Sequence, residues 1–321
     1  MFVILLYESY CQGGALKMKK REWICFTFII FSLIMSIFAF LPINKSYKVD
    51  PWMSKVSDNT RIKDLSIPGT HDSGAMHSLF DVAGKCQDLS IIKQLDVGVR
   101  FFDIRLQLVD DELNVVHSFV DQELKFEWVL NYYKNFLKKY DSEFIIMSIK
   151  EDADSKDSAK SFKDVLVSLL SKYNDYICYD NKLPETIKDA RGKIYILSRY
   201  ELDFGISAYQ GWRDSTTFEI NDLYIQDNYC ISDVNVKKND IISTLDYSKN
   251  NNDKLVLNFT SCYIDGAFPP TYAGSAAKEI NPWFIEYINE NSQDRLGIIV
   301  ADFMTSELAL SIYRRNIAWD Y

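Results

Sequence analysis

The sequence predicts an α/β fold: an irregular TIM-type β/α barrel in a single domain, preceded by an N-terminal hydrophobic targeting segment. Apolar runs of strand length recur through residues 50–321. Several are continuously apolar and β-branched, as in parallel strands covered on both faces. Eight strands alternating with helices in about 250 residues suit such a barrel. A doubly wound open sheet is the second interpretation, but the sequence has no GxGxxG or GxxxxGK[ST] phosphate loop.

The predicted strands follow one another without a Pro/Gly-rich linker, which favours one domain. They are residues 65–67, 99–106, 113–116, 144–149, 193–197, 223–225, 255–259 and 297–300. Between them, residues 127–139 and 161–173 have apolar positions at helical spacing and predict two of the connecting helices.

The N-terminus predicts export. Four basic residues precede an uncharged run of 18 residues at 24–41: Lys17, Lys19, Lys20 and Arg21. Such a run is a signal peptide or a membrane anchor, and its basic flank stays cytoplasmic. The bulky Phe40 and Leu41 make a poor cleavage signal, so an uncleaved anchor is an alternative to secretion, and a buried core helix is the third interpretation. We expect residues 1–17 to be an upstream mis-start, 18–45 the targeting segment and 50–321 the barrel, secreted or anchored at the outer face of the membrane.

Charge and cysteines limit the function classes. The formal net charge is −9; residues 1–49 carry +4, which leaves −13 on the rest of the chain. So acidic a body argues against sequence-independent nucleic-acid binding. The six cysteines form no CxxC pair, so no zinc ribbon or redox motif is visible. For the four in the body, free thiols and disulfides remain open alternatives.

Polar residues follow nearly every predicted strand. At or just after the carboxyl ends stand His71, Asp72, Asp103, Arg105, His117, Lys150, Arg199, Asp227, Tyr229 and Asp302. In a barrel these ends meet on one face, so we expect the side chains to converge on one concavity.

This set suits a phosphodiester substrate. Histidine takes and gives protons near neutral pH, so His71 and His117 predict a general base and a general acid. Cationic side chains would bind the phosphate and stabilise its developing charge. The carboxylates could form an oxygen site for Ca²⁺ or Mg²⁺, but Arg105 stands among them and would repel a cation. We therefore expect metal-independent chemistry with no cofactor, and a metal site is the alternative.

Seven segments, in order, carry a family resemblance. IKDLSIPGTHDSGAM (62–76) and GVRFFDIR (98–105) resemble the catalytic X region of bacterial phosphatidylinositol-specific phospholipase C. The resemblance continues through IIMSIKED, ARGKIYILSRY, IQDNY, LNFTS and IIVADF, and it covers the chain from about residue 54 to the C-terminus. It implies an irregular barrel that is a phosphorus–oxygen lyase, converting phosphatidylinositol into diacylglycerol and a 1,2-cyclic inositol phosphate.

The resemblance also implies the acid–base roles. His71 would deprotonate the inositol 2-hydroxyl, with Asp302 orienting its ring. His117, assisted by Asp72, would protonate the diacylglycerol oxygen. Arg105 would bind the phosphate where metal-dependent relatives hold calcium.

Substrate contacts follow from the same resemblance. Asp103 would support the phosphate-binding group. Lys150, Arg199 and Asp227 match positions that hydrogen-bond the inositol hydroxyls, and Tyr229 matches the ring that stacks on the inositol. The implied partners are phosphatidylinositol in a membrane surface and glycosylphosphatidylinositol-anchored proteins, with the enzyme a monomer.

The chain departs from the family pattern in two places. Ser118 follows His117 where the family often has glycine, which puts the local loop geometry in question. Residues 75–95 form a shorter stretch than expected and lack tryptophan. Two roles, membrane contact and core packing, are equally expected for four side chains: Leu79, Phe80, Phe268 and Tyr272.

Two other functions stay open from the residues. A related barrel phosphodiesterase acting on glycerophosphodiesters or sphingomyelin would gather carboxylates around Mg²⁺, and Arg105 counts against it. A non-catalytic surface protein that binds inositol lipids would not need two proton-transfer groups, so His71 and His117 count against it.

Overall fold

The computed structural model describes residues 49–77, 84–265, 272–291 and 295–317. The chain divides into two compact units, Met1–Ser46 and Tyr47–Tyr321, and every described residue belongs to the second. The predicted targeting segment and Leu79, Phe80 and Phe268 lie outside the described residues. Within them, no helix has both the length and the apolar character to cross a bilayer.

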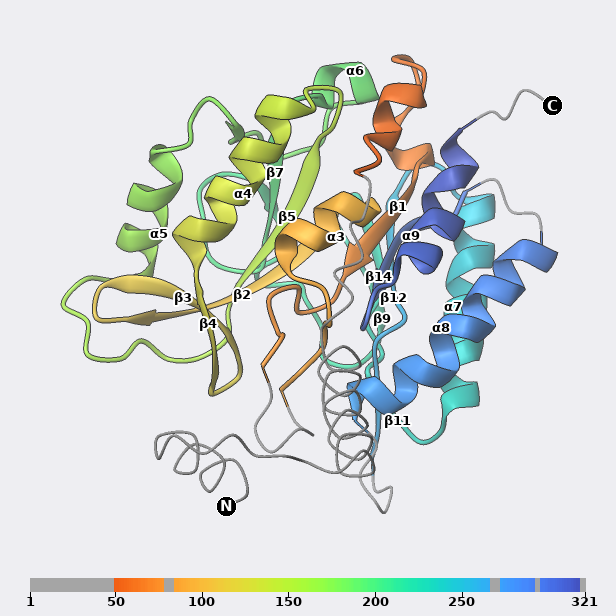
Figure 1. The fold of residues 1–321 in the computed structure, drawn as a ribbon. Coiled ribbons are helices and arrows are strands. Elements are labelled where there is room, and N and C mark those ends of the chain that lie inside the picture. The colour runs from red at the N-terminus through yellow and green to blue at the C-terminus, as the bar shows by residue number, and fades with distance from the viewer. Residues whose placement is uncertain (1–48, 78–83, 266–271, 292–294, 318–321) are drawn as a thin grey trace, which may run out of the picture. The chain divides into compact units, whose positions relative to one another are not determined.

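A mixed sheet of twelve strands forms the centre of the unit (Figure 1). Along its main path the order is β6-β7-β5-β2-β1-β14-β12-β10-β9, with β3 paired to β2, β4 paired to β3 and β8 paired to β7. The strand bounds are β1 Ser66–Thr70, β2 Phe101–Val109, β3 Glu112–His117, β4 Val120–Lys125, β5 Ile145–Glu151, β6 Ile177–Cys178, β7 Ile194–Ser198, β8 Ile206–Ser207, β9 Thr217–Ile220, β10 Leu223–Gln226, β12 Leu255–Phe259 and β14 Gly297–Ala301. Two more strands, β11 Cys230–Ile231 and β13 Tyr263–Ile264, pair separately.

The sheet curls into a half-barrel. Its long parallel strands follow the circular order of a β/α barrel that is opened between β7 and β10. The prediction of a single α/β domain with a curved sheet is confirmed. Among the described residues no strand pairing closes the gap, so the sheet lacks the ring closure of a TIM barrel.

All eight predicted strands exist, with ends shifted by up to three residues. One has a different role: β3 is antiparallel to β2 and forms a hairpin with β4. Its hydrophobic pattern resembles that of a barrel strand because Leu113, Val115 and Val116 are buried. The sequence analysis missed β4 and the short strands β6, β8, β9, β11 and β13, which carry too few residues for a periodic signal.

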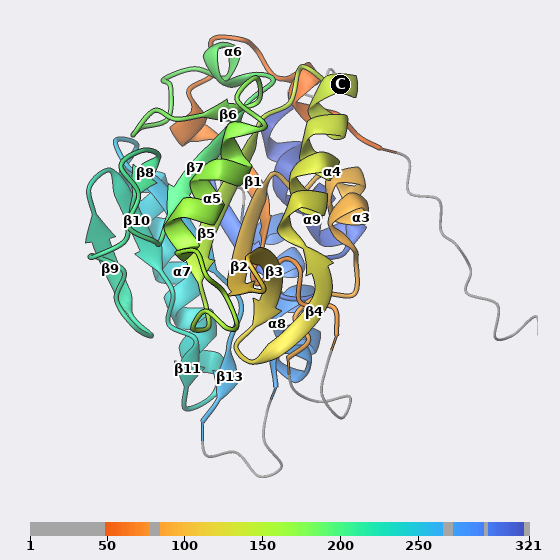
Figure 2. The same ribbon diagram turned by 90° about the vertical axis from the view of Figure 1, so that its left-hand side faces the viewer.

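Helices follow the curve of the sheet, and neighbouring helices contact one another along it (Figure 2). Their bounds are α3 Ile91–Val97, α4 Phe126–Lys139, α5 Phe162–Ser171, α6 Ile187–Ala190, α7 Val234–Asn250, α8 Ala273–Glu290 and α9 Ser306–Tyr313, with 3₁₀ turns at Trp52–Lys55, Ile62–Asp64 and Arg314–Asn316. Side-chain caps start several of them: Ser161 accepts a hydrogen bond from Asp164 N, and Asp233 accepts from Asn235 N and Val236 N.

The turn after α3 aligns β2 for the site. Gly98 ends α3 with φ 109°, and a Cβ there would come 2.6 Å from Tyr313. This left-handed, crowded position favours glycine. Three residues later β2 enters the core with its first four side chains fully buried, which fixes the register of the polar groups further along the strand.

Candidate active site

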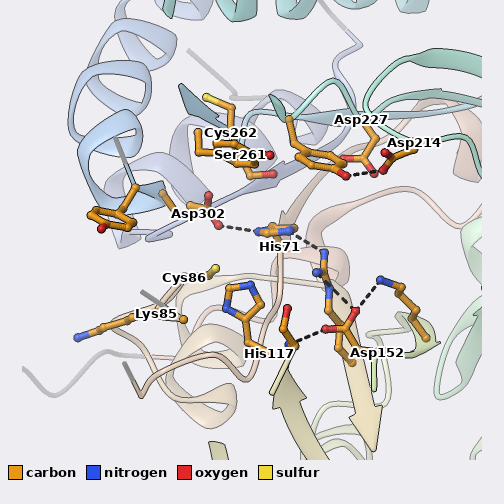
Figure 3. Close-up of a pocket in the computed structure, with 18 of the residues that line it drawn as sticks. His71, Lys85, Cys86, His117, Asp152, Asp214, Asp227, Ser261, Cys262 and Asp302 are labelled. Carbon is orange, nitrogen blue, oxygen red and sulfur yellow. Dashed lines mark hydrogen bonds and ion pairs between the residues drawn. The ribbon is translucent and has the colours of Figure 1, made fainter. Parts of the chain in front are cut away.

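A pocket of about 690 Å³ lies at the carboxyl ends of the parallel strands (Figure 3). Its size suits a small ligand. Eight of the ten residues predicted from the sequence line it: His71, Arg105, His117, Lys150, Arg199, Asp227, Tyr229 and Asp302. The other two, Asp72 and Asp103, have no exposed surface and lie behind Arg105.

His71, at the end of β1, is held from both sides. Its Nδ1 lies 2.8 Å from Asp302 Oδ1, and its Nε2 lies 2.7 Å from Arg105 Nη2. The guanidinium can only donate, so Nε2 must accept, and the ring proton sits on Nδ1, where it donates to Asp302. This tautomer leaves the Nε2 lone pair facing the pocket, as a general base requires.

The electrostatics raise the pKa of His71 above its ordinary 6.5. Burial is the largest influence and by itself would lower this pKa, and Arg105 acts in the same direction. The carboxylates of Asp302 and Asp103, with the hydrogen bond from Nδ1 to Asp302, outweigh both.

Arg105 on β2 is the centre of the ion-pair network. Its Nε donates to Asp103 Oδ2 at 3.1 Å, and its Nη1 lies 3.5 Å from Asp72 Oδ2 and 3.9 Å from Asp152 Oδ1. Burial alone would raise the pKa of Asp103, but Arg105 and Arg199 hold that pKa well below its ordinary value. The carboxylates conversely raise the pKa of Arg105, which therefore carries a fixed positive charge.

His117 occupies the end of β3, across Asp72 from the guanidinium. His117 Nε2 lies 3.6 Å from Asp72 Oδ2. Burial raises the pKa of Asp72. Ser118, the departure from glycine, takes φ 52°, and its backbone N–H donates to Asp152 Oδ2 at 2.8 Å. The loop thus keeps a left-handed turn that glycine adopts easily, at some conformational cost to serine.

Aromatic and cationic side chains form the opposite wall. The Arg199 guanidinium lies 3.9 Å from the ring centre of Trp212, and Trp212 Nε1 donates to Asp227 Oδ2 at 3.0 Å. The Tyr229 hydroxyl donates to Asp214 Oδ1. These contacts fix a planar cation, a ring and a carboxylate side by side, which suits a polyol such as inositol.

The pocket residues that the sequence analysis missed include Cys86, Asp152, Trp212 and Asp214. Asp152 accepts from Lys150 Nζ at 2.5 Å and from Ser118 N, so it ties two loops together. Asp152 directly follows β5, so it could have been predicted from the sequence in the same way as the other polar residues at strand ends. The other three lie in loops without a recognisable pattern.

The carboxylates do not gather as an oxygen site. Within the described ranges, the groups of side chains close enough to share a metal are His71, Cys86 and Asp302, and Asp72, Cys86 and His117. Asp103 belongs to neither group, and its oxygens contact Arg105 and Arg199. Cys86, Cys178, Cys230 and Cys262 are all free thiols, which decides between the two alternatives for the body cysteines.

Comparison with known proteins identifies the family. Residues 65–200 match the family model "Phosphatidylinositol-specific phospholipase C, X domain". A 1-phosphatidylinositol phosphodiesterase of Listeria monocytogenes is 28% identical and aligns over 97% of this chain and 99% of its own length. A protein of that name from Staphylococcus aureus is 31% identical over 78% of this chain and 87% of its own.

Solved structures agree with these sequence matches. Phosphatidylinositol-specific phospholipase C from Listeria monocytogenes superposes with a TM-score of 0.70 at 28% identity, covering 83% of this chain and 98% of that one. An F249X mutant of the Staphylococcus aureus enzyme gives a TM-score of 0.72 at 29% identity over 81% and 96% of the two chains. Fold, pocket and sequence thus agree, and the chain belongs to the bacterial phosphatidylinositol-specific phospholipase C family.

Proposed function

We propose that this chain is a phosphatidylinositol-specific phospholipase C that cleaves phosphatidylinositol into diacylglycerol and inositol 1,2-cyclic phosphate. The observation that carries the proposal is the chain of contacts from His71 through Arg105 and Asp72 to His117. It brings a base, a fixed cation and an acid to one pocket, which is what in-line displacement at phosphorus needs.

In the first half of the reaction His71 Nε2 takes the proton of the inositol 2-hydroxyl. The substrate hydroxyl replaces Arg105 Nη2 at this nitrogen, and the guanidinium turns to the phosphate oxygens. Asp302 stabilises the imidazolium that forms, through the 2.8 Å contact at Nδ1.

In the second half the 2-oxygen forms a bond to phosphorus as the bond to the glycerol oxygen breaks. His117 gives its proton to that leaving oxygen, and Asp72, 3.6 Å away, stabilises the charged His117 before transfer. Arg105 stabilises the charge on the phosphate oxygens, so the reaction uses a side-chain cation and proceeds without an added metal.

The opposite wall selects inositol. Lys150, Arg199 and Asp227 offer donors and acceptors to the ring hydroxyls, and Tyr229 offers an aromatic face. Asp227 and Asp214 would repel additional phosphates, which favours an unphosphorylated inositol ring. Glycosylphosphatidylinositol anchors carry the same headgroup, and release of an anchored protein from vesicles tests them as targets.

The pocket opens to a membrane surface. Phe119 is 82% exposed directly after the pocket-lining Ser118, and the pocket is also lined by Tyr263, which is exposed, and by Tyr272, which is half-buried. We define these three as the rim aromatics, and the exposed rings of Phe119 and Tyr263 suit insertion between lipid headgroups. Of the four membrane contacts expected from the sequence, only Tyr272 falls within the described residues.

Export and assembly complete the proposal. Residues 18–45 direct the barrel, residues 50–321, across the membrane, either as a cleaved signal or as an anchor at the outer face, and the enzyme works as a monomer. Translation begins at Met18. N-terminal sequencing of the nascent and mature products tests both the start and the cleavage.

The assay that tests this proposal identifies the phosphorus-containing products of the reaction. Purified protein is incubated with phosphatidylinositol in mixed micelles, with and without EDTA, and the products are identified by phosphorus NMR. We expect the cyclic phosphate in both samples. His71→Ala and His117→Ala each lower the rate by about two to four decades, whereas His77→Ala, at the third histidine, retains it. Wild-type turnover by either of the first two variants overturns the assignment, and cleavage of sphingomyelin instead identifies the alternative enzyme.

A further inference from the structure

Cys86 is a thiol in the acid–base pocket for which the proposed reaction has no use. It is 1% exposed and lines the pocket wall. Its backbone is fixed on both sides: its N–H donates to Ala75 O at 2.8 Å, and its carbonyl accepts from Phe303 N at 2.7 Å. Figure 3 shows its sulfur directed into the space between His117 and Asp302.

We infer that Asp72, Cys86 and His117 form an inhibitory binding site for Zn²⁺. One ligand atom from each residue lies within 4.8 Å of the other two. The 3.6 Å between His117 Nε2 and Asp72 Oδ2 is close to the roughly 3.3 Å that separates two ligands of a tetrahedral zinc ion. Little rearrangement is therefore needed.

Unused polar atoms favour this group over the one that contains His71. Within the described part of the chain, neither oxygen of the fully buried Asp72 accepts a hydrogen bond, and its Oδ2 has only the longer ion-pair contacts with Arg105 and His117. Buried polar atoms normally have a hydrogen-bond partner. Both nitrogens of His71, by contrast, are already engaged by Asp302 and Arg105.

The ligand chemistry selects the metal. A thiolate, an imidazole and a carboxylate are a zinc set, whereas Ca²⁺ and Mg²⁺ require a larger shell of oxygens. Bonds form from zinc to sulfur, nitrogen and oxygen; the thiol proton passes to solvent, and a water molecule takes the fourth position. The two negative ligands balance the charge of the ion, so Arg105, 3.5 Å from Asp72 Oδ2, faces a neutral complex and keeps Asp103 as its counter-ion at 3.1 Å.

Zinc in this position removes the proposed acid. With a His117 nitrogen and Asp72 coordinated, the proton for the leaving oxygen has no donor, so turnover stops. This consequence for activity rests on the proposed function, whereas the binding itself does not. Zinc binding and zinc inhibition are therefore measured separately.

Binding is measured by calorimetric titration of chelator-treated full-length protein with ZnCl₂. We expect one site, weakened at least about tenfold by Cys86→Ser or His117→Ala, since each removes a ligand. His71→Ala should keep the zinc affinity within about threefold of wild type, because His71 belongs to the other candidate group of metal ligands. Cys262→Ser, at the other buried pocket thiol, is the matched control and binds as wild type. Equal affinity in Cys86→Ser and wild type overturns the site.

Cobalt(II) supplies a readout independent of affinity and turnover. We expect a thiolate-to-cobalt charge-transfer band in the wild type and in Cys262→Ser, and its loss in Cys86→Ser. A band that persists in Cys86→Ser overturns the assignment.

Inhibition is then compared in the phosphatidylinositol assay, each variant relative to its own zinc-free rate. Cys86→Ser should need at least about tenfold more zinc for half inhibition. Zinc bound through Cys86 without inhibition supports the site and refutes His117 as the acid. Absence of phosphatidylinositol turnover refutes the proposed function and leaves the binding result to decide the zinc site.

Discussion

Asp302→Asn tests the base of the proposed mechanism most directly. Asp302 is 2% exposed and accepts the Nδ1 proton of His71 at 2.8 Å. When His71 takes the substrate proton, a positive ring forms about 4 Å from the carboxylate charge. At an effective dielectric constant of about 20 this attraction is about 4 kcal/mol. Asparagine keeps a hydrogen-bonding oxygen but removes the charge.

The expected loss is therefore about three decades in kcat, because each 1.4 kcal/mol on the barrier is tenfold. The substitution also changes the pH profile. Asp302 is the main group that raises the pKa of His71. Since the base works only when deprotonated, wild-type kcat/KM should fall as pH drops through a pKa above 6.5, and in Asp302→Asn this limb should move to lower pH.

The assay is initial-rate turnover of phosphatidylinositol in mixed micelles across a pH series. Asp233→Asn is the matched control because Asp233 only caps α7, and asparagine caps a helix equally well. A rate within about threefold of wild type, with an unshifted acid limb, would refute the view that Asp302 stabilises the charged ring.

Three further predictions concern stability and the membrane. Glu143→Ala should cost about 3–5 kcal/mol in the free energy of unfolding by urea, because it leaves the fully buried Arg100 guanidinium without its 2.7 Å partner; an unchanged midpoint would contradict this. Ser118→Gly should raise the free energy of unfolding by about 1 kcal/mol, since φ there is 52°, and a loss of stability would show that the turn is not strained. Phe119→Ser should weaken binding to phosphatidylinositol vesicles about tenfold in a sedimentation assay. The control Trp128→Ser, at an exposed aromatic residue of α4, should bind as wild type. Equal binding by both variants and the wild type would show that Phe119 does not contact the membrane.

The strands were predictable because their signal is local. Residues 145–147 and 298–301 are apolar at consecutive positions, and such runs are buried on both faces wherever they pair. Whether a strand is parallel depends on its connection instead. β3 follows β2 after a two-residue turn, and so short a link permits only an antiparallel hairpin. Closure of the ring depends on curvature summed over the whole sheet, which no single segment encodes.

The candidate site divides in the same way. A polar residue directly after an apolar run is visible in the sequence, so His71, Arg105 and Asp302 could be named in advance. Trp212 and Cys86 lie in irregular segments, and nothing in their neighbours marks them. They enter the pocket because strands from distant parts of the chain carry their loops to the same edge.

The ionisable groups that follow the strands can be read directly from the chain, so two imidazoles and several cations are known to be available before any coordinates are seen. How those groups act depends on the folded arrangement. His71 and Asp302 are 231 positions apart in the chain, yet Asp302 accepts the Nδ1 proton of the base. The position of Arg105 among three carboxylates, and of a thiol beside both histidines, likewise depends on distances between strands. The physical reason is that side-chain identity is encoded residue by residue, whereas pKa, tautomer and metal affinity arise from charges brought within a few ångströms by the packing of the entire sheet.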